Sequence, residues 1–492
     1  MLICVCDKFL CYTKMENKMK NKITKFVFVL LNILFAVPSV VYFIKYKTLF
    51  GFNIENNFFL DLFLNNIVAT ITYTILFVLL MIFYSLLLKN DIFKNTKQTF
   101  MYIAIISVIY VFIVPWTSTD IFYYIGVGEL DGVYHQNPYY VTMAEYYNEN
   151  KDIINDEILE SGAKNCWAST TVIYGPIAQM IFSFCSRISF KNTTLAIFNF
   201  KIFNLIIHML NCYLIFKLCN KKIYSLMYGI NPFILFELIG NVHNDVVVIF
   251  FVLLALYFVI KKKNIIASIV ALTLATGIKY YTVLLLPVVV LYYFRDEKNV
   301  RNRIIKCVEC ALIFGIIYLV QYIPYFKDIK ILFASFVQGE KYTKSIYAAL
   351  INLKFEKISV ILKGMVVIIL LLKCIDTYIS FLFEENKNIS KMLRKYNSIL
   401  ILAILILSNC QIWYFSWLFP TIMWQSKKCK INIIVFSAIT EIANFVYMLN
   451  LTNPGRSFNY VVTITILFGA WNIFYELNRK YKRNKLKIKS IA

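Results

Sequence analysis

One aspartate stands where the sequence leaves an apolar stretch long enough to cross a bilayer. Asp120, in WTSTDIFYYIGVG, follows a stretch at 99–116 that carries no charged residue. A carboxylate at such a boundary is costly unless it is paired or faces water, so it is a functional candidate. It could act as a general base that removes a proton from a hydroxyl nucleophile. The alternative is N-capping of the next helix by Thr119 or Asp120.

Two further groups of polar residues lie at the ends of apolar stretches. His243, Asn244 and Asp245 stand together in ELIGNVHND, and Lys279 stands in TGIKYY. Ionisable residues at the ends of spanning stretches are costly unless they are paired or face water, so these residues are functional candidates too. The alternatives are a polar cap on the helix that begins at Asp245 and, for Lys279, a side chain that reaches out to the interface.

A third group combines aromatic and polar side chains. QIWYFSW contains Gln411, Trp413 and Tyr414, and aromatic rings of this kind can stack on a sugar. For Trp413 and Tyr414 the alternative is an aromatic belt at the membrane interface. Arg456 stands in the last loop between apolar stretches, where it is either a functional residue or a side chain that reaches the interface.

Membrane-spanning helices must position these residues. The chain has 492 residues, of which 60% are hydrophobic and 17% aromatic, and its mean hydropathy is +0.66. Uncharged stretches close to the roughly 20 residues of a spanning helix recur from end to end. The sequence therefore predicts an all-α polytopic membrane protein. The candidate spans are 26–44, 67–88, 99–116, 174–188, 194–218, 223–240, 245–260, 264–278, 280–294, 304–323, 359–382, 397–410, 412–425, 431–449 and 459–477.

The distribution of charge predicts the orientation. Lysine and arginine total 51 against 27 acidic residues, and they gather in short loops and at both ends of the chain. By the positive-inside rule both termini are cytoplasmic, so the number of crossings is even and we expect about fourteen. The segment that fails to cross lies in 174–240. It is either 174–188, as a re-entrant segment, or 223–240, which Asn231-Pro232 interrupts.

The same charges divide the chain. We expect a basic cytoplasmic N-terminus at 1–25, one integral domain in the cell membrane at 26–477, and a basic cytoplasmic tail at 478–492. External loops are expected at 117–172 and 324–358, and the polar groups described above fall on this outer side. The first loop holds nine acidic residues against two lysines, and we expect short helices at the membrane surface. The net charge of +24 is explained by this topology, so nucleic acid is not an expected partner.

Five motifs between about 115 and 420 resemble, in order, those of polyprenol-phosphate-mannose-dependent mannosyltransferases of the GT-C superfamily, the bacterial α-1,6 type in particular. WTSTDIFYYIGVGELDGVYHQNPYY resembles the first-loop motif, IYGPIAQMIF the YGP element and NPFILFELIGNVHNDVVV the HND element. TGIKYYTVLLLP and QIWYFSWLFP resemble the fourth and fifth motifs of the family. Ile412 and Tyr280 stand where the family usually has proline, a departure that concerns helix breaks and not the chemistry. The residues matching the first three motifs are Asp120, Tyr124, Gly128, Asn137, Pro138, Tyr139, Tyr174, Gly175, Pro176, Asn231, Pro232, Glu237, His243, Asn244 and Asp245.

The resemblance implies a GT-C type helix bundle and an inverting glycosyltransferase that works at the outer face of the membrane. The donor would be a sugar, mannose by resemblance, on a polyprenyl phosphate, and the acceptor a cell-envelope glycan or glycolipid. Asp120 would be the catalytic base. The donor phosphate would bind Lys279, His243 and Arg456. Sugar or acceptor contacts would come from Tyr124, Asn137, Tyr139, Tyr174, Asn244, Asp245, Gln411, Trp413 and Tyr414.

Other functions stay open on the sequence. A polymerase, ligase or flippase of lipid-linked glycans would share the lipid substrate. A secondary transporter would place its polar residues near the midplane and often shows repeated halves, which we do not find here. The cysteines lack metal-ligand spacing, so no zinc site is predicted. A divalent metal shared by Asp120 and Asp245 is compatible with the sequence, although neither spacing nor ligand count requires one.

Overall fold

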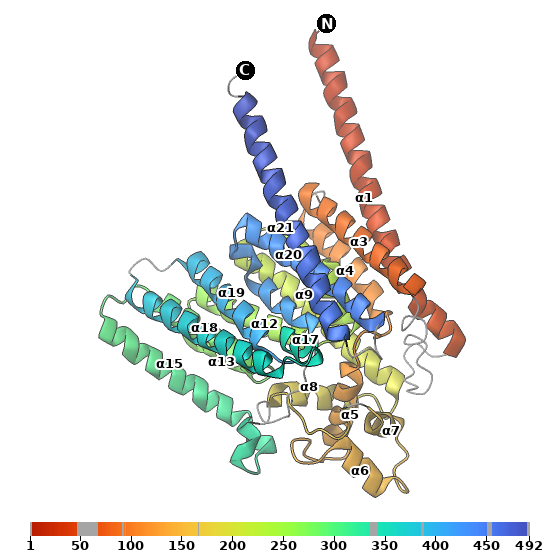
Figure 1. The fold of residues 1–492 in the computed structure, drawn as a ribbon, viewed down its shortest axis with the longest axis vertical. Coiled ribbons are helices and arrows are strands. Elements are labelled where there is room, and N and C mark those ends of the chain that lie inside the picture. The colour runs from red at the N-terminus through yellow and green to blue at the C-terminus, as the bar shows by residue number, and fades with distance from the viewer. Residues whose placement is uncertain are drawn as a thin grey trace.

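The computed structural model describes residues 2–46, 67–90, 93, 95–165, 167–333, 343–384, 388–449 and 455–489. This part of the chain forms helices and loops without a strand, which confirms the predicted all-α class (Figure 1). The α-helices are α1 (Leu2–Tyr46), α3 (Ile67–Asn90), α4 (Thr96–Val111), α5 (Asp120–Gly132), α6 (Met143–Asn150), α7 (Glu157–Ala163), α8 (Pro176–Arg187), α9 (Thr193–Cys219), α10 (Lys222–Gly229), α11 (Pro232–Leu235), α12 (Asp245–Tyr257), α13 (Ile265–Thr276), α14 (Leu286–Tyr293), α15 (Val300–Val320), α17 (Ile346–Asn352), α18 (Glu356–Phe383), α19 (Ile389–Ile406), α20 (Lys427–Leu449) and α21 (Arg456–Lys489). The π-helices are η1 (Phe236–Gly240) and η2 (Phe258–Lys262), and the 3-10 helices are η3 (Tyr280–Leu285), η4 (Ile323–Tyr325), η5 (Ile329–Phe333) and η6 (Ile412–Trp424).

Asparagine side chains cap the N-termini of six of these helices, one of which is α11 with Asn231. Asn95, Asn192, Asn264, Asn299 and Asn388 occupy the N-cap positions of α4, α9, α13, α15 and α19. In each case the side-chain oxygen accepts a hydrogen bond from a backbone N–H of the first turn. Such a cap typically contributes about 1 kcal/mol to helix stability. These asparagines therefore fix where the apolar helices begin.

Several helices have the length and composition of membrane spans. Among the described residues, seven helices are long and apolar enough to cross, or up to eight if one bent pair is a single span. This supports a multi-pass membrane protein, whereas the count of fourteen crossings stays a prediction. The seven are Met19–Tyr42, Ile67–Lys89, Thr193–Cys219, Val300–Tyr325, Glu356–Phe383, Lys427–Met448 and Arg456–Arg479, and the shorter apolar helices are Thr96–Val111, Ile265–Thr276 and Tyr280–Tyr293.

The predicted break at Asn231-Pro232 is confirmed. The pieces Lys222–Gly229 and Pro232–Gly240 meet at an angle of 54°. Pro232 lies in the first turn of the second piece, where its missing N–H leaves no hydrogen bond unmade. Asn231 caps this piece by accepting from the N–H groups of the next two non-proline residues. The second piece ends in the π-helix η1, a geometry frequent at functional sites.

Two expected spans are not regular α-helices. The segment 412–425 forms the 3-10 helix η6, and 280–294 divides into η3 and α14. Pro420 lies inside η6 and lacks the N–H that a continuous α-helix would need there. Nearly all of η6 is buried, so its irregular backbone meets protein and not lipid, as a membrane protein requires.

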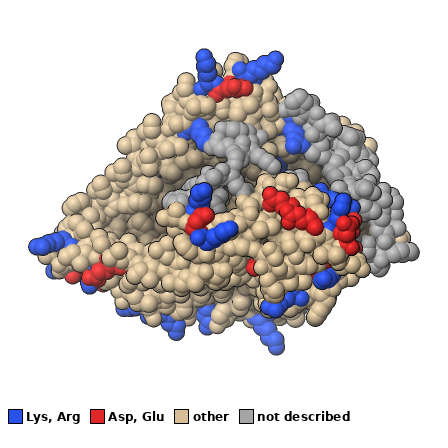
Figure 2. Space-filling view, turned by 90° about the horizontal axis from the view of Figure 1, so that it is seen from below, with Lys and Arg blue, Asp and Glu red and all other residues tan. Residues whose placement is uncertain are grey.

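The two ends of the bundle carry different elements. α1 and α21 extend from the bundle at the end where both termini lie, whereas α5, α6 and α7 lie at the opposite end (Figure 1). Figure 2 views the molecule from this opposite end, where charged side chains form only small groups among uncharged ones. The short helices expected in 117–172 are therefore present. Most of α5, however, is buried against protein, and its densest packing is with α8.

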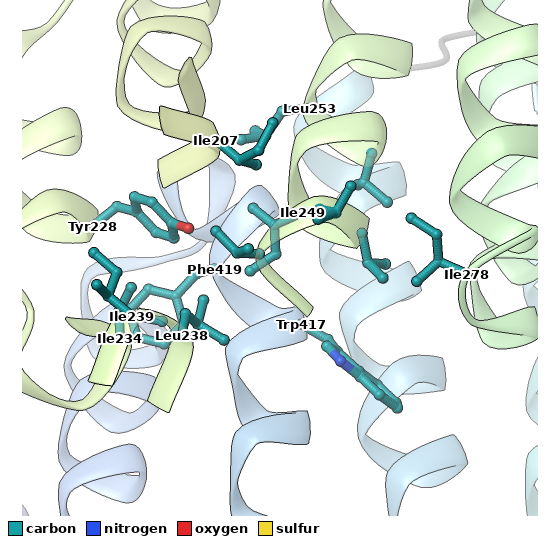
Figure 3. Close-up of a cluster of buried hydrophobic side chains, with 14 of the residues drawn as sticks. Ile207, Tyr228, Ile234, Leu238, Ile239, Ile249, Leu253, Ile278, Trp417 and Phe419 are labelled. Carbon is teal, nitrogen blue, oxygen red and sulfur yellow. The ribbon is translucent and has the colours of Figure 1, made fainter. Parts of the chain in front are cut away.

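A core of large apolar side chains lies beneath the outer polar residues. Figure 3 shows this core, in which α9, α10, η1, α12 and η6 meet. Because lipid is as apolar as these side chains, close packing and not exclusion of water fixes how such helices sit together. The labelled residues are Ile207, Tyr228, Ile234, Leu238, Ile239, Ile249, Leu253, Ile278, Trp417 and Phe419.

The contact between α5 and α8 depends on Gly128. A Cβ atom at this position would overlap the backbone carbonyl of Phe182 and the hydroxyl of Ser186. We expect Gly128→Ala to destabilise the protein by about 3 kcal/mol, the upper end of typical overpacking, because a backbone carbonyl cannot move aside easily. Thermal unfolding in detergent measures the effect. The matched control is Gly315→Ala, whose Cβ meets no described atom within 4 Å, so a similar loss there would contradict the explanation.

Candidate active site

Asp120 is the first residue of α5, and its carboxylate faces two tyrosines. The Tyr124 hydroxyl donates to Asp120 Oδ2 at 3.3 Å and lies 3.2 Å from the Tyr174 hydroxyl. Thr119 is the N-cap residue of α5 but makes no side-chain cap hydrogen bond. The cap by Thr119 is therefore not formed, and the Asp120 carboxylate accepts from Tyr124.

The surroundings of Asp120 make it a stronger base than an ordinary aspartate. Burial raises the pKa of Asp120 from 3.8 to about 6, against the lowering effects of Lys279, Tyr124 and Lys344. The side chain retains 18% of its surface exposed. A carboxylate of this kind is charged at neutral pH and within reach of a substrate, which suits proton removal from a hydroxyl group.

His243 lies directly behind Asp120. Its Nδ1 is 3.7 Å from Asp120 Oδ2, its Nε2 is 3.2 Å from Glu237 Oε2, and its ring stacks on that of Trp413 with centroids 3.5 Å apart. Burial, together with Lys279 and Lys344, holds the pKa of His243 well below its usual range, so the imidazole is neutral. The preceding residue, Val242, has a φ of 63°. This conformation is strained for a β-branched residue, as is common where a backbone aims a functional group.

A buried lysine holds together the backbone segments that lead to Asp120 and His243. Lys201, in α9, donates to the carbonyl oxygens of Ile113 at 2.6 Å, Ile239 at 3.2 Å and Gly240 at 2.7 Å. An ammonium group carries three donors, and here each serves a carbonyl near the end of a helix. Lys201, on α9, therefore fixes the spacing between Asp120 and His243.

Lys279 and Asp245 form an ion pair beside Asp120. Lys279 Nζ lies 2.9 Å from Asp245 Oδ1 and 2.8 Å from Oδ2, and the Trp417 indole also donates to Oδ1. The Lys279 ammonium is 4.8 Å from the Tyr414 ring centroid and 5.9 Å from that of Tyr174. Two of its three donors serve Asp245, which leaves one for a ligand. The proposed role of Asp245 as a sugar contact is thereby restricted, because both its oxygens are engaged.

The contact of Tyr174 with Lys279 depends on a close approach of two glycines. The Gly277 carbonyl accepts from the N–H of Ile177 at 3.0 Å, and a Cβ on Gly175 would overlap that carbonyl. The YGP and GIK motifs, about a hundred positions apart in the sequence, thus lie backbone to backbone.

A second lysine, Lys344, approaches the site from the segment 324–358. It is buried, has a φ of 53°, and donates to Gln411 Oε1 at 3.3 Å. Its ammonium lies 5.9 Å from the Trp413 ring centroid and 4.9 Å from that of Tyr447. Burial lowers the pKa of Lys344 to about 8, while nearby carboxylates act to raise it. Lys344 therefore adds a cation on the Trp413 side of the site.

The structure also places four other predicted site residues, which are Arg456, Asn137, Tyr139 and Asn244. Arg456 lies over the Tyr447 ring at 4.6 Å, next to Lys344. Asn137 donates to the Tyr325 carbonyl at 2.8 Å, and Tyr139 donates to the Tyr174 carbonyl at 2.8 Å, so both support the outer loops.

Asn244 is the N-cap residue of α12 but forms no side-chain cap hydrogen bond, so a cap by this residue is not formed. Its buried amide makes no hydrogen bond with the described residues. For Asn137, Tyr139 and Asn244 a direct sugar contact remains a prediction.

The metal alternative gains no support from the arrangement. In the described part of the chain, no group of three or more His, Cys, Asp or Glu residues has the geometry to hold a metal ion. Asp245, the second expected ligand, already accepts from Lys279 and Trp417. The residues present therefore fit a lysine-based phosphate site better than a divalent cation site.

Three residues at the site received no role from the sequence. Lys344 stands in a loop without a motif, so nothing in the sequence marks it. Glu237 matched the HND element, but its place against His243 depends on the π-helix. Glu441 lies within the apolar helix α20 and interacts with Glu237. An ionisable residue inside an apolar span is a functional candidate by default, and this signal could have identified Glu441.

Comparison with known families agrees with the motif resemblance. Residues 54–295, just short of half the chain, match the model for the N-terminal domain of alpha-(1->6)-mannopyranosyltransferases. The matched stretch includes Asp120, Tyr174, His243 and Lys279. No curated protein and no solved structure matches the chain significantly. The match to the N-terminal domain of this family supports a mannosyltransferase of that family, and the protein is a glycosyltransferase.

Proposed function

We propose that the protein transfers mannose, with inversion, from a polyprenyl-phosphate donor to a glycan or glycolipid acceptor at the outer face of the cell membrane. The observation that carries this proposal is the partly exposed Asp120 carboxylate, whose charge is influenced by two lysines, Lys279 and Lys344. A base beside cations is the arrangement needed when a hydroxyl attacks a carbon that bears a phosphate leaving group. The family assignment supports transfer of mannose over a flippase or a transporter.

In the proposed reaction the acceptor hydroxyl attacks the anomeric carbon of mannose while Asp120 takes the hydroxyl proton. The bond from that carbon to the phosphate oxygen breaks, and polyprenyl phosphate leaves with an added negative charge. Lys279, with its remaining donor, and Lys344 stabilise this charge, and Arg456 extends the positive region past Tyr447. Tyr174, Trp413 and Tyr414 supply ring surfaces for the sugar.

The proposed topology follows from the same positions. The site lies toward the end of the bundle that carries α5 to α7, away from both termini (Figure 1). If the basic termini are cytoplasmic, as the positive-inside rule predicts, Asp120 faces outward. Cysteines introduced at exposed positions of α6 would then react with an impermeant reagent added outside. Labelling of such cysteines only after the cell is opened would place the site in the cytoplasm.

The pKa of Asp120 predicts a pH dependence. Asp120 must be charged to take a proton, so the transfer rate should be highest near pH 7, and it should fall again at higher pH as Lys344 loses its charge above a pKa of about 8. It should fall about tenfold per pH unit below a pKa near 6. Tyr124→Phe removes a hydrogen bond that lowers this pKa, so the fall should begin at a higher pH. Initial rates between pH 4 and pH 9, at saturating donor, measure both curves. A rate that stays flat down to an ordinary aspartate pKa would contradict the assignment.

The stereochemistry of the product tests the proposed mechanism. Direct attack at the anomeric carbon gives a product whose anomeric configuration is opposite to that of the donor. Nuclear magnetic resonance of the glycoside formed from synthetic polyprenyl-phosphate mannose reads this configuration. Retention would require a covalent intermediate or a second displacement, and it would overturn the role of Asp120 as a base acting directly on the acceptor.

A further inference from the structure

A line of buried ionisable groups extends from Asp120 into the protein. His243 separates two carboxylates, with Asp120 Oδ2 at 3.7 Å from Nδ1 and Glu237 Oε2 at 3.2 Å from Nε2. The histidine and Glu237 side chains are both 0% exposed. Neither imidazole nitrogen, nor Glu237 Oε2, makes a hydrogen bond of good geometry with any described residue. A neutral imidazole between two carboxyls, without other partners, can pass a proton from one to the other.

Glu237 is itself next to another buried carboxyl. Glu441, on α20, is 0% exposed and interacts with Glu237 and with Asn444. Two carboxyls that share a buried site cannot both be charged, so the pair holds one proton and can accept one more. The charged groups that act on the pair and on His243 include Asp120, Lys279 and Lys344, and the tyrosines Tyr110 and Tyr460 also interact with Glu441. Asn241 holds Glu237 in place by donating to Oε1 at 3.1 Å and to the Thr117 hydroxyl at 2.6 Å.

We propose that His243 and Glu237 relay the proton taken up by Asp120 into the carboxyl pair Glu237–Glu441. This inference rests on the proposed function, because it takes Asp120 as the base. The acceptor O–H bond breaks and its proton joins Asp120 Oδ2. That proton moves to His243 Nδ1 while the proton on Nε2 moves to Glu237. The imidazole stays neutral and changes tautomer, no electron is transferred, and the path reverses through the partly exposed Asp120 after the product leaves.

The relay has a consequence for the leaving group. Glu237 and Glu441 both act electrostatically on Lys344. When the pair gains a second proton it loses its negative charge, and the Lys344 ammonium is then free to compensate the polyprenyl phosphate as it leaves. Removal of the acceptor proton by Asp120 is thereby linked to stabilisation of the leaving phosphate by Lys344.

Glu237→Gln tests the relay directly. Glutamine can still accept a hydrogen bond from His243 but cannot take a proton. We expect kcat to fall at least tenfold, with the donor KM unchanged. We also expect the dependence of rate on deuterium content of the solvent to change. In the wild type two protons move together, so this dependence is curved, whereas in Glu237→Gln it becomes linear. Glu237→Asp, which keeps a carboxyl, should retain the curvature at a reduced rate.

The matched control is Glu129→Gln. Glu129 is a buried carboxyl on the same helix as Asp120, and it interacts with Asp156. Burial raises the pKa of Glu129 to about 8, so it is neutral at pH 7 and glutamine replaces it without a change of charge. This variant should keep the wild-type rate and the curved isotope dependence. A Glu237→Gln variant that matches this control in both measurements would overturn the relay.

Infrared spectroscopy provides a test that does not need activity. Neutral Glu129 contributes its own C=O band of a protonated carboxyl. A second such band should be lost in Glu237→Gln and also in Glu441→Gln, because both variants remove the pair that shares the proton. If the wild type shows no mannosyl transfer but the band behaves in this way, the proposed function fails while the carboxyl pair stands. If transfer occurs but neither variant changes the band or the isotope dependence, the relay fails alone. Size-exclusion elution confirms that each variant is folded.

Discussion

Asp120→Asn should abolish mannosyl transfer while leaving the protein folded. The substitution keeps the size of the side chain and an oxygen for the Tyr124 hydrogen bond, but it removes the proton acceptor. Positioned general bases typically contribute about 10²–10⁴-fold to a rate, so we expect kcat to fall by at least about 100-fold. The donor KM should change little, because Lys279 and Lys344, the proposed phosphate ligands, remain. Initial rates with purified protein in lipid vesicles measure both parameters.

Glu129→Gln again serves as the control for Asp120→Asn, since it changes a buried carboxyl elsewhere on α5. Equal losses in the two variants would show that α5 is merely sensitive to substitution. A wild-type rate in Asp120→Asn at pH 8, with normal elution from a size-exclusion column, would show that Asp120 is not the base.

Asp245→Asn should have the second largest effect, on stability as well as activity. Lys279 is 10% exposed and Asp245 is 0% exposed, so the substitution leaves a nearly buried ammonium without its counter-charge. Removing one member of a buried ion pair typically costs about 3–5 kcal/mol. The lysine would also turn from the site it shares with Tyr174 and Tyr414. We therefore expect a lower unfolding temperature and almost no transfer.

A double variant separates the two consequences of Asp245→Asn. In Lys279→Met combined with Asp245→Asn no unpaired charge remains, so the unfolding temperature should return toward the wild-type value. Transfer should stay absent because a phosphate ligand has been lost. If the double variant is as unstable as Asp245→Asn, the ion pair is not the source of the stability. If it regains transfer, Lys279 is not needed for the donor phosphate.

The sequence was informative where a polar residue interrupts or ends an apolar stretch. Asp120, His243, Asp245 and Lys279 are visible for this reason, and the structure brings all four together. The break at Asn231-Pro232 is visible because proline cannot continue a helix and asparagine starts one. Such signals are local, and the physical cost of a charge or a lost donor in a membrane makes them specific.

Features that depend on contacts between distant segments could not be predicted. Nothing in the sequence near Lys344 indicates that a left-handed backbone directs it toward Gln411. No local sequence pattern predicts the π-helix η1 that contains Glu237, or the approach of Glu237 to His243. The segment that forms η6 likewise has the composition of a membrane span, because apolar side chains are favoured both inside protein and in contact with lipid. Only the packed structure separates these two cases.

The measurement that tests the central claim most directly is transfer from two donors compared side by side. Vesicles containing the purified protein and a glycolipid acceptor fraction receive labelled mannose either on polyprenyl phosphate or on a nucleotide. We predict labelled glycolipid and released polyprenyl phosphate, in equal amounts, only with the lipid-linked donor, and neither product with Asp120→Asn. Transfer from the nucleotide donor alone, or release of polyprenyl phosphate that Asp120→Asn does not slow, would contradict the proposed function.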